Sequence, residues 1–184
     1  MIGVARRRYR KTGVSVIASD NFNRADNTTS LGTADTGQAW AVSSGTWGIS
    51  SNTAYDTTSA TAQTAQIEAG KADCTVSITY ANNPNNAGGG SGLSCRVASS
   101  GNFYFVARDV AGKCVNGSLT VLASYTTAVA LDVMSVTLSG SSLVVKKNGV
   151  QVGSFTDSTF PTQTLHGLWA NSNNLTRFDN FSIA

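Results

Sequence analysis

The stretch CTVSITY, residues 74–80, decides the fold class, because apolar or aromatic residues alternate with hydroxyl-bearing ones without a break. Side chains of a β-strand point alternately to opposite faces of the sheet, so this pattern predicts a strand with one buried face and one face in water. The same alternation recurs in residues 93–97, 119–123 and 134–138. Short alternating runs of this kind, separated by clusters of Gly, Asn, Ser or Asp, are typical of a β-sandwich.

A hairpin at residues 143–152, LVVKKNGVQV, is the clearest local signal. Asn148-Gly149 supplies the two positive φ angles of a type I′ turn, which predicts that Lys147 pairs with Val150 and Val145 with Val152. No segment shows a helical period over ten residues. About a dozen short strands with short connections favour an all-β fold, a two-sheet antiparallel jelly-roll sandwich, over a seven-stranded immunoglobulin-like one.

Length and charge divide the chain into a basic arm and one domain. The 184 residues suffice for a single domain with a sizeable core, which we place at residues 14–184. Five of the thirteen basic residues lie in the arm, residues 1–13, whereas the rest of the chain has eight basic residues against ten acidic ones. The candidate partner-binding residues of the arm are Arg6, Arg7, Arg8, Tyr9, Arg10 and Lys11.

The arm has three interpretations: phosphate contacts with nucleic acid, a solvated tail, or docking on an acidic protein surface. We favour docking on a protein over nucleic acid, because one cluster on a nearly neutral domain provides no second basic face. The apolar run that follows, residues 14–18, is too short for a secretory signal or a membrane span. We therefore expect synthesis in the cytoplasm without a signal peptide, and no membrane contact.

Motifs for catalysis are missing from the sequence. Glycoside hydrolysis normally needs two carboxylates, and Glu68, the only glutamate, has no acidic neighbour on its predicted strand. His166 is the only histidine, and no Gly-x-Ser-x-Gly motif accompanies it. We expect no enzymatic activity and no catalytic residues. Cys74, Cys95 and Cys114 fit buried thiols, with a disulfide between Cys74 and Cys95 left open.

The two ends of the chain carry motifs that resemble a known superfamily. Residues 20–26, DNFNRAD, with Trp40 and residues 45–49, GTWGI, at the start, and residues 177–183, RFDNFSI, at the end, resemble concanavalin A-like (laminin G-like) jelly-roll domains of the lectin/glucanase type. The resemblance covers residues 19–184. Hydrolases of this superfamily carry Glu, Asp and Glu on one strand, a pattern that this chain lacks. Other members are glycan-binding modules and tail and capsid proteins of bacteriophages.

This resemblance, together with the basic arm, implies a non-enzymatic bacteriophage virion structural protein. We expect a capsid decoration or accessory protein whose arm is anchored on the major capsid or tail protein of the virion. Its lectin-like domain would be exposed on the virion surface, and clustering into a trimer is left open. The alternative is a minor tail protein or a carbohydrate-binding module that recognises host glycans.

A glycan site is expected where an aromatic ring lies beside amide side chains, because sugars stack on the ring while the amides bind their hydroxyl groups. Trp40 and Trp47 have a spacing that fits the core better than the surface. The candidate glycan-binding residues are Trp169, Asn171, Asn173 and Asn174.

Acidic and amide residues at both ends of the domain form a second candidate site. In a jelly roll the terminal strands lie side by side, so Phe22 and Phe181 are expected to face the core. The neighbouring polar residues either cap strand ends or converge into an oxygen cage for a structural calcium ion. These residues are Asp20, Asp26, Asp179 and Asn180, and no other cofactor is expected.

Overall fold

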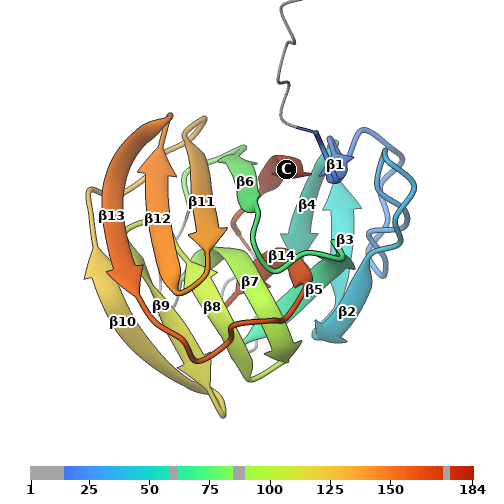
Figure 1. Ribbon diagram of the computed structural model, residues 1–184. Coiled ribbons are helices and arrows are strands. Elements are labelled where there is room, and N and C mark those ends of the chain that lie inside the picture. Colours follow the sequence, from blue (N-terminus) through green and yellow to red (C-terminus); the bar gives the residue numbers. More distant parts are fainter. Residues whose placement is uncertain (1–14, 59–61, 85–89, 172–174) are drawn as a thin grey trace, which may run out of the picture.

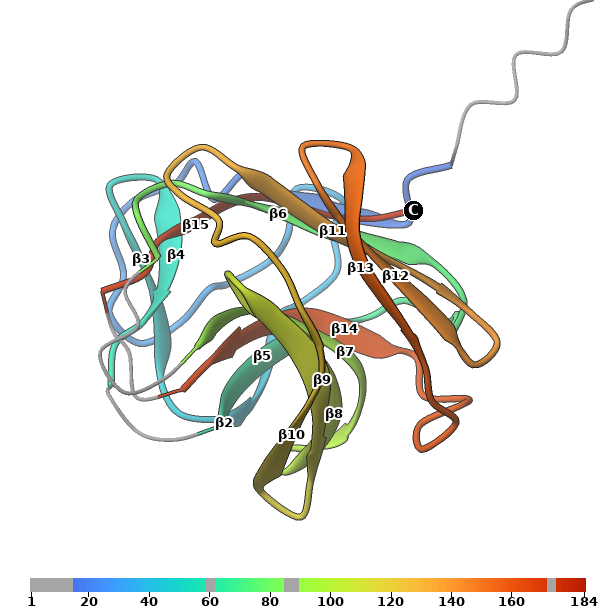
Figure 2. The same cartoon turned by 90° about the vertical axis from the view of Figure 1, so that its left-hand side faces the viewer.

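A computed structural model describes residues 15–58, 62–84, 90–171 and 175–184 (Figure 1). In these residues the chain forms fifteen strands and no helix, so none of the described segments is a helix that could cross a membrane. The strands form two antiparallel sheets stacked face to face (Figure 2). The predicted all-β jelly-roll sandwich is confirmed.

The first sheet has the order β13 (Val150–Thr156), β12 (Ser142–Lys147), β11 (Val133–Ser139), β6 (Thr75–Tyr80), β15 (Phe178–Ile183), β4 (Thr53–Asp56) and β3 (Trp47–Ser50), and β1 (Ala18–Asp20) pairs with β15. The second has the order β10 (Ser118–Ser124), β9 (Val110–Val115), β8 (Asn102–Val106), β7 (Ser91–Ser99), β14 (Leu165–Ala170), β5 (Gln63–Glu68) and β2 (Ala41–Ser44).

The main core lies between the two sheets, and β6 shows how the sequence produces it. Val76, Ile78 and Tyr80 are fully buried in this strand, whereas the residues that alternate with them are partly exposed. The buried Tyr80 hydroxyl donates a 2.6 Å hydrogen bond to the Ser91 carbonyl of the second sheet. The alternation in residues 74–80 therefore describes a half-buried strand, as predicted.

The hairpin between β12 and β13 has the predicted turn but a different register beyond it. Asn148 and Gly149 have φ angles of 51° and 79°, and Lys147 pairs with Val150. The predicted pairing of Val145 with Val152 is wrong, because Val145 pairs with Gly153. A β-bulge between Val145 and Lys146 in the ladder inserts one extra residue into β13, which shifts every later pair by one.

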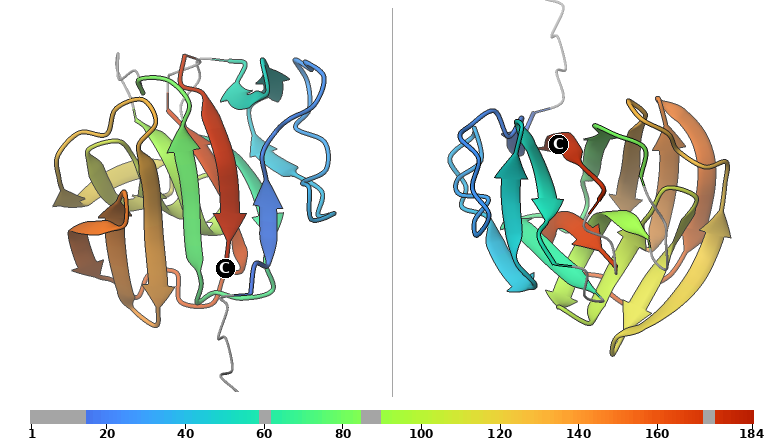
Figure 3. Two further views of the ribbon diagram at one scale, coloured as in Figure 1. Left: turned by 90° about the horizontal axis from the view of Figure 1, so that it is seen from above. Right: turned by 180° about the vertical axis from the view of Figure 1, so that it is seen from behind.

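The start and the end of the domain lie side by side, because β1 pairs with β15 (Figure 3). Phe22 and Phe181 are both buried, and the Trp40 ring lies 5.8 Å from the first ring and 4.9 Å from the second. The expectation that both phenylalanines face the core is confirmed.

The three cysteines are free and buried, so Cys74 and Cys95 form no disulfide in this structure. Burial raises the pKa of Cys74 to about 11.

Burial lowers the pKa of His166 to about 4, so its ring is neutral at pH 7. One ring nitrogen, Nδ1, accepts a hydrogen bond from the Arg96 amide, and Nε2 donates to the Lys71 carbonyl. His166 is therefore a structural residue of β14.

A charge network fastens the connection after β13 to the second sheet, and we expect it to make stability pH-dependent. The Asp157 carboxylate accepts hydrogen bonds from Lys113 (2.6 Å) and Tyr104 (2.8 Å). Burial alone would raise the pKa of Asp157, but these bonds and those from Thr159 outweigh it and hold the pKa well below its usual value. The network therefore stabilises the fold fully above about pH 4 and progressively less as the pH falls further.

The variant Asp157→Asn tests this network. At pH 7 we expect it to be less stable than the parent by about 1.5–3 kcal/mol, the value of a hydrogen bond to a charged group. The difference should shrink between about pH 4 and pH 2, where unfolded aspartate takes up its proton. Urea unfolding at several pH values measures it. A difference that stays constant down to pH 2 would contradict the assignment.

Candidate functional site

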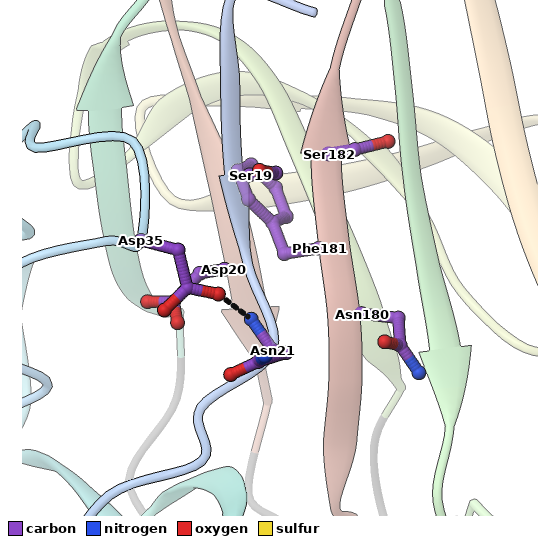
Figure 4. A pocket seen from close by; sticks show the side chains of 7 residues that line it. All are labelled: Ser19, Asp20, Asn21, Asp35, Asn180, Phe181 and Ser182. Atoms are coloured by element: carbon purple, nitrogen blue, oxygen red, sulfur yellow. Dashed lines mark hydrogen bonds between the residues drawn. The ribbon is translucent and has the colours of Figure 1, made fainter.

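The pairing of β15 changes partner along one edge, and this change creates a pocket. Residues Phe181 to Ile183 pair with β1, whereas Phe178 pairs with β4, so Asp179 and Asn180 lie between the two partner strands. A shallow pocket of ≈ 330 Å³ opens at this fork in the first sheet. We call it the fork pocket. Its lining consists of Ser19, Asp20, Asn21, Asp35, Asn180, Phe181 and Ser182 (Figure 4).

A β-bulge places Asn180 at this pocket. The ladder between β15 and β6 shifts its register between Asp179 and Ser182, and Asn180 has a φ of 49°. Asparagine tolerates this left-handed conformation better than most residues that have a side chain. The backbone amide of Asn180 donates to Asp179, whereas its exposed side-chain amide makes no hydrogen bond to any described residue and can bind a ligand through both polar atoms.

Asp20 forms the buried base of the fork pocket. Its carboxylate is 1% exposed and accepts hydrogen bonds from the Arg24 guanidinium at 2.6 and 3.0 Å, which form a bidentate ion pair. It also accepts the Trp40 indole N–H at 2.7 Å and the Phe22 amide at 2.8 Å. With four donors already bound, Asp20 holds the turn after β1 in place and has no oxygen free for a ligand.

Asp35 supplies the exposed carboxylate of the fork pocket. One oxygen, Oδ2, accepts the Asn21 backbone amide at 2.9 Å, and Oδ1 has no partner among the described residues. Asn21 in turn accepts the Asn23 backbone amide through its own Oδ1, and its side-chain NH₂ group has no partner among the residues that the structure describes. Figure 4 shows the Asp35 and Asn21 side chains next to each other. The pocket thus combines a free carboxylate oxygen with free amide groups.

Side chains tie the Asp35 loop to β1. Thr36 Oγ1 accepts the Ser19 amide at 2.9 Å and bonds to Gln38 Oε1 at 2.5 Å. Gln38 donates from Nε2 to the Ile17 carbonyl at 2.8 Å. The loop is therefore held in position before a ligand binds, which lowers the entropic cost of ordering it on binding.

The four residues of the expected calcium site are not brought together. Asp20 and Asn180 line the fork pocket, but Asp26 and Asp179 do not. Asp26 accepts the Ser51 amide at 2.8 Å, and Asp179 accepts the amide of Asn180. Within residues 15–58, 62–84, 90–171 and 175–184, no group of three or more His, Cys, Asp or Glu side chains is placed to hold a metal ion. The three carboxylates cap backbone amides instead.

The expected glycan platform is also different in the structure. Trp169 is 1% exposed, and its ring lies 4.9 Å from Phe105 and 6.2 Å from Phe103. It belongs to a second apolar cluster, on the face of the second sheet opposite the main core, because it alternates with core residues Leu168 and Ala170. The Trp169 ring is therefore packed inside the protein and is not placed to stack against a sugar in this structure.

The remaining predicted residues are placed as follows. Asn171 follows β14; it donates its backbone amide to the Gly90 carbonyl and accepts the Ala62 amide through Oδ1. Asn173 and Asn174 lie outside the described residues, as do Arg6, Arg7, Arg8, Tyr9, Arg10 and Lys11 of the arm. Asp35 and Asn21, which the sequence did not single out, supply the free polar groups of the fork pocket together with Asn180.

Comparison with known proteins places the fold in a defined class. No family model and no curated protein matches the sequence. Among solved structures, the carbohydrate-binding module CBM66 from Bacillus subtilis has a TM-score of 0.65 at 21% identity, and the match covers 85% of this chain and 96% of that module. The GH43 protein BlXynB from Bacillus licheniformis has a TM-score of 0.63 at 13% identity, with 98% of this chain but only 40% of that protein covered.

A third similar structure is domain 4 of AbnA, a GH43 extracellular arabinanase from Geobacillus stearothermophilus, in complex with arabinotriose. It has a TM-score of 0.51 at 9% identity, over 91% of each chain. At these identities the likeness shows the fold. The chain is a two-sheet antiparallel jelly-roll sandwich, a fold that it shares with the CBM66 module and with domain 4 of AbnA.

Proposed function

We propose that this domain is a carbohydrate-binding module that attaches to a glycan without cleaving it. The observation that carries the proposal is the alignment of the jelly roll, almost end to end, with a separate carbohydrate-binding module. The likeness to domain 4 of an arabinanase, a structure in complex with arabinotriose, supports the same function. The fork pocket adds a rigid, polar and exposed site on the surface of this fold.

The carboxylates of the fork pocket do not suit hydrolysis of the glycan. A glycoside hydrolase uses two carboxyl groups, one of which exchanges a proton and one of which attacks the sugar or activates water. Asp20 is buried and bound by four donors, so Asp35 is the one carboxylate of the pocket with a free oxygen. One free carboxylate supports binding rather than acid and base catalysis.

The virion hypothesis has no support from the comparisons. Capsid decoration, anchoring of the arm on a capsid or tail protein, trimer formation and location at the virion surface rest on the sequence alone. What the comparisons favour is the alternative, recognition of a glycan.

The proposal predicts that the full chain is retarded in native gels that contain a polysaccharide ligand. A panel of arabinan, xylan, mannan, galactan and fructan, with polygalacturonate and alginate as acidic members, is suitable. Bovine serum albumin serves as the control for nonspecific retardation, and a reducing-sugar assay checks for cleavage. Retardation by at least one polysaccharide without release of reducing ends is expected. Free mobility in every gel, or steady release of reducing ends, would refute the proposal.

A further inference from the structure

We infer that the fork pocket takes an uncharged sugar through adjacent hydroxyl groups, with Asp35 as the main hydrogen-bond acceptor. This inference rests on the proposed function and names its site and its ligand class.

The polar groups of the pocket match the chemistry of a sugar diol. A hydroxyl group donates one hydrogen bond and accepts others, so two neighbouring hydroxyls are best bound by an acceptor and a donor side by side. Asp35 Oδ1 is a free acceptor, and the NH₂ group of Asn21 is a free donor on the residue whose amide holds Asp35 in place. The Asn180 side-chain amide also lines the pocket, on the other side of β15 from Asp35 (Figure 4), and provides a further donor and acceptor there.

The charge of the pocket excludes acidic sugars. Among the residues that the structure describes, no lysine or arginine lines it, and the charge of Asp20 is already balanced by Arg24. The charge of Asp35 is not balanced by any ion pair among the described residues. A uronic acid, sialic acid or phosphorylated sugar would place its negative charge next to this carboxylate, whereas a neutral hydroxyl donates to it in a charge-assisted hydrogen bond.

The described residues of the pocket provide no exposed aromatic ring for stacking, which sets the expected strength of binding. Phe181 is 1% exposed and packs against Trp40. One sugar unit of about twelve heavy atoms, bound at the low free energy per atom that is usual for drug-sized ligands, has an expected Kd of about 2 mM. Binding to a single sugar should therefore be weak, and a polymer with many ends or repeats should be retained through its higher local concentration of sites.

Two substitutions in the full chain test the site. Asp35→Asn keeps the size of the side chain and removes its charge, and Asn180→Gly removes the amide while preserving a left-handed backbone position. We expect each substitution to raise the dissociation constant measured in affinity gels about tenfold, because each removes one charge-assisted or well-placed hydrogen bond. The matched control is Asp26→Asn, which changes another exposed aspartate that accepts one backbone amide but lies outside the pocket. It should bind like the parent.

The panel separates failure of the inference from failure of the proposed function. If the parent binds none of the polysaccharides, the proposed function fails. If the parent binds but Asp35→Asn and Asn180→Gly bind equally well, glycan binding stands and the fork pocket is the wrong site. Retention only on polygalacturonate or alginate, or loss of binding on addition of EDTA, also overturns the inference, since the first shows an acidic ligand and the second a metal bridge.

Discussion

Replacing Arg96 with methionine is expected to lower the unfolding free energy of the domain by about 3–5 kcal/mol, because three backbone carbonyls lose their hydrogen-bond donor. Arg96 lies in β7 and is 0% exposed, which is unusual for a charged side chain. Its guanidinium donates to the carbonyls of Ala72 (3.0 Å), Gly140 (2.8 Å) and Phe160 (3.3 Å) and to the Asp73 carboxylate (2.7 Å).

The effect is large because these partners belong to three separate connections. Ala72 precedes β6, Gly140 lies in the turn between β11 and β12, and Phe160 lies between β13 and β14. Arg96 therefore holds these three connections together at one end of the sandwich. Methionine fills much of the same volume but donates no hydrogen bond, so three carbonyls lose their guanidinium partner.

The control for this prediction is Asp73→Asn, which removes the charge at the other end of the ion pair. The Asp73 side chain is 58% exposed, so water replaces much of the lost interaction, and we expect an effect below about 1 kcal/mol. Urea unfolding of both variants at pH 7 gives the comparison. Equal losses for the two variants would show that the ion pair, and not the buried carbonyl contacts, determines the stability.

Arg96 also shows where sequence reasoning stops. The alternation of Leu93, Cys95 and Val97 predicts a strand with Arg96 on its wet face, and the strand is there. However, Arg96 has a φ of 48°, and the ladder between β7 and β8 shifts register after Cys95. This bulge turns the side chain into the protein. Alternation reports which face a residue takes in a regular strand, and it carries no signal for an irregular one.

The same limit explains why the sequence indicates some residues of the fork pocket and not others. The motif at residues 20–26 and its counterpart at 177–183 correctly indicated that the two ends of the domain meet, which brings Asp20 and Asn180 to one place. Asp35 is placed there by bonds between Thr36 and Ser19 and between Gln38 and Ile17, contacts seventeen and twenty-one residues apart. Such contacts depend on the folded loop and leave no periodic trace in the sequence.

Trp169→Ala is expected to destabilise the domain by about 3–5 kcal/mol, the usual loss when a buried tryptophan is truncated. The ring fills the second apolar cluster, and the Phe105 and Phe103 rings contact it. Neither phenylalanine can fill the space without leaving its own site, so a cavity remains. Trp169→Phe keeps an aromatic ring at the same place and should lose only about 1–2 kcal/mol, in proportion to its smaller cavity.

Binding by these variants distinguishes a core residue from a sugar platform. Because Trp169 is 1% exposed, we expect Trp169→Phe to be retarded by the same polysaccharide as the parent, with an unchanged dissociation constant. Urea unfolding confirms first that the variant is folded at the temperature of the binding gels. A folded Trp169→Phe that binds about tenfold more weakly, while Asp35→Asn binds normally, would place the sugar on the second sheet instead of at the fork. The opposite pattern follows if the ligand lies at the fork pocket and the indole only packs within the second apolar cluster.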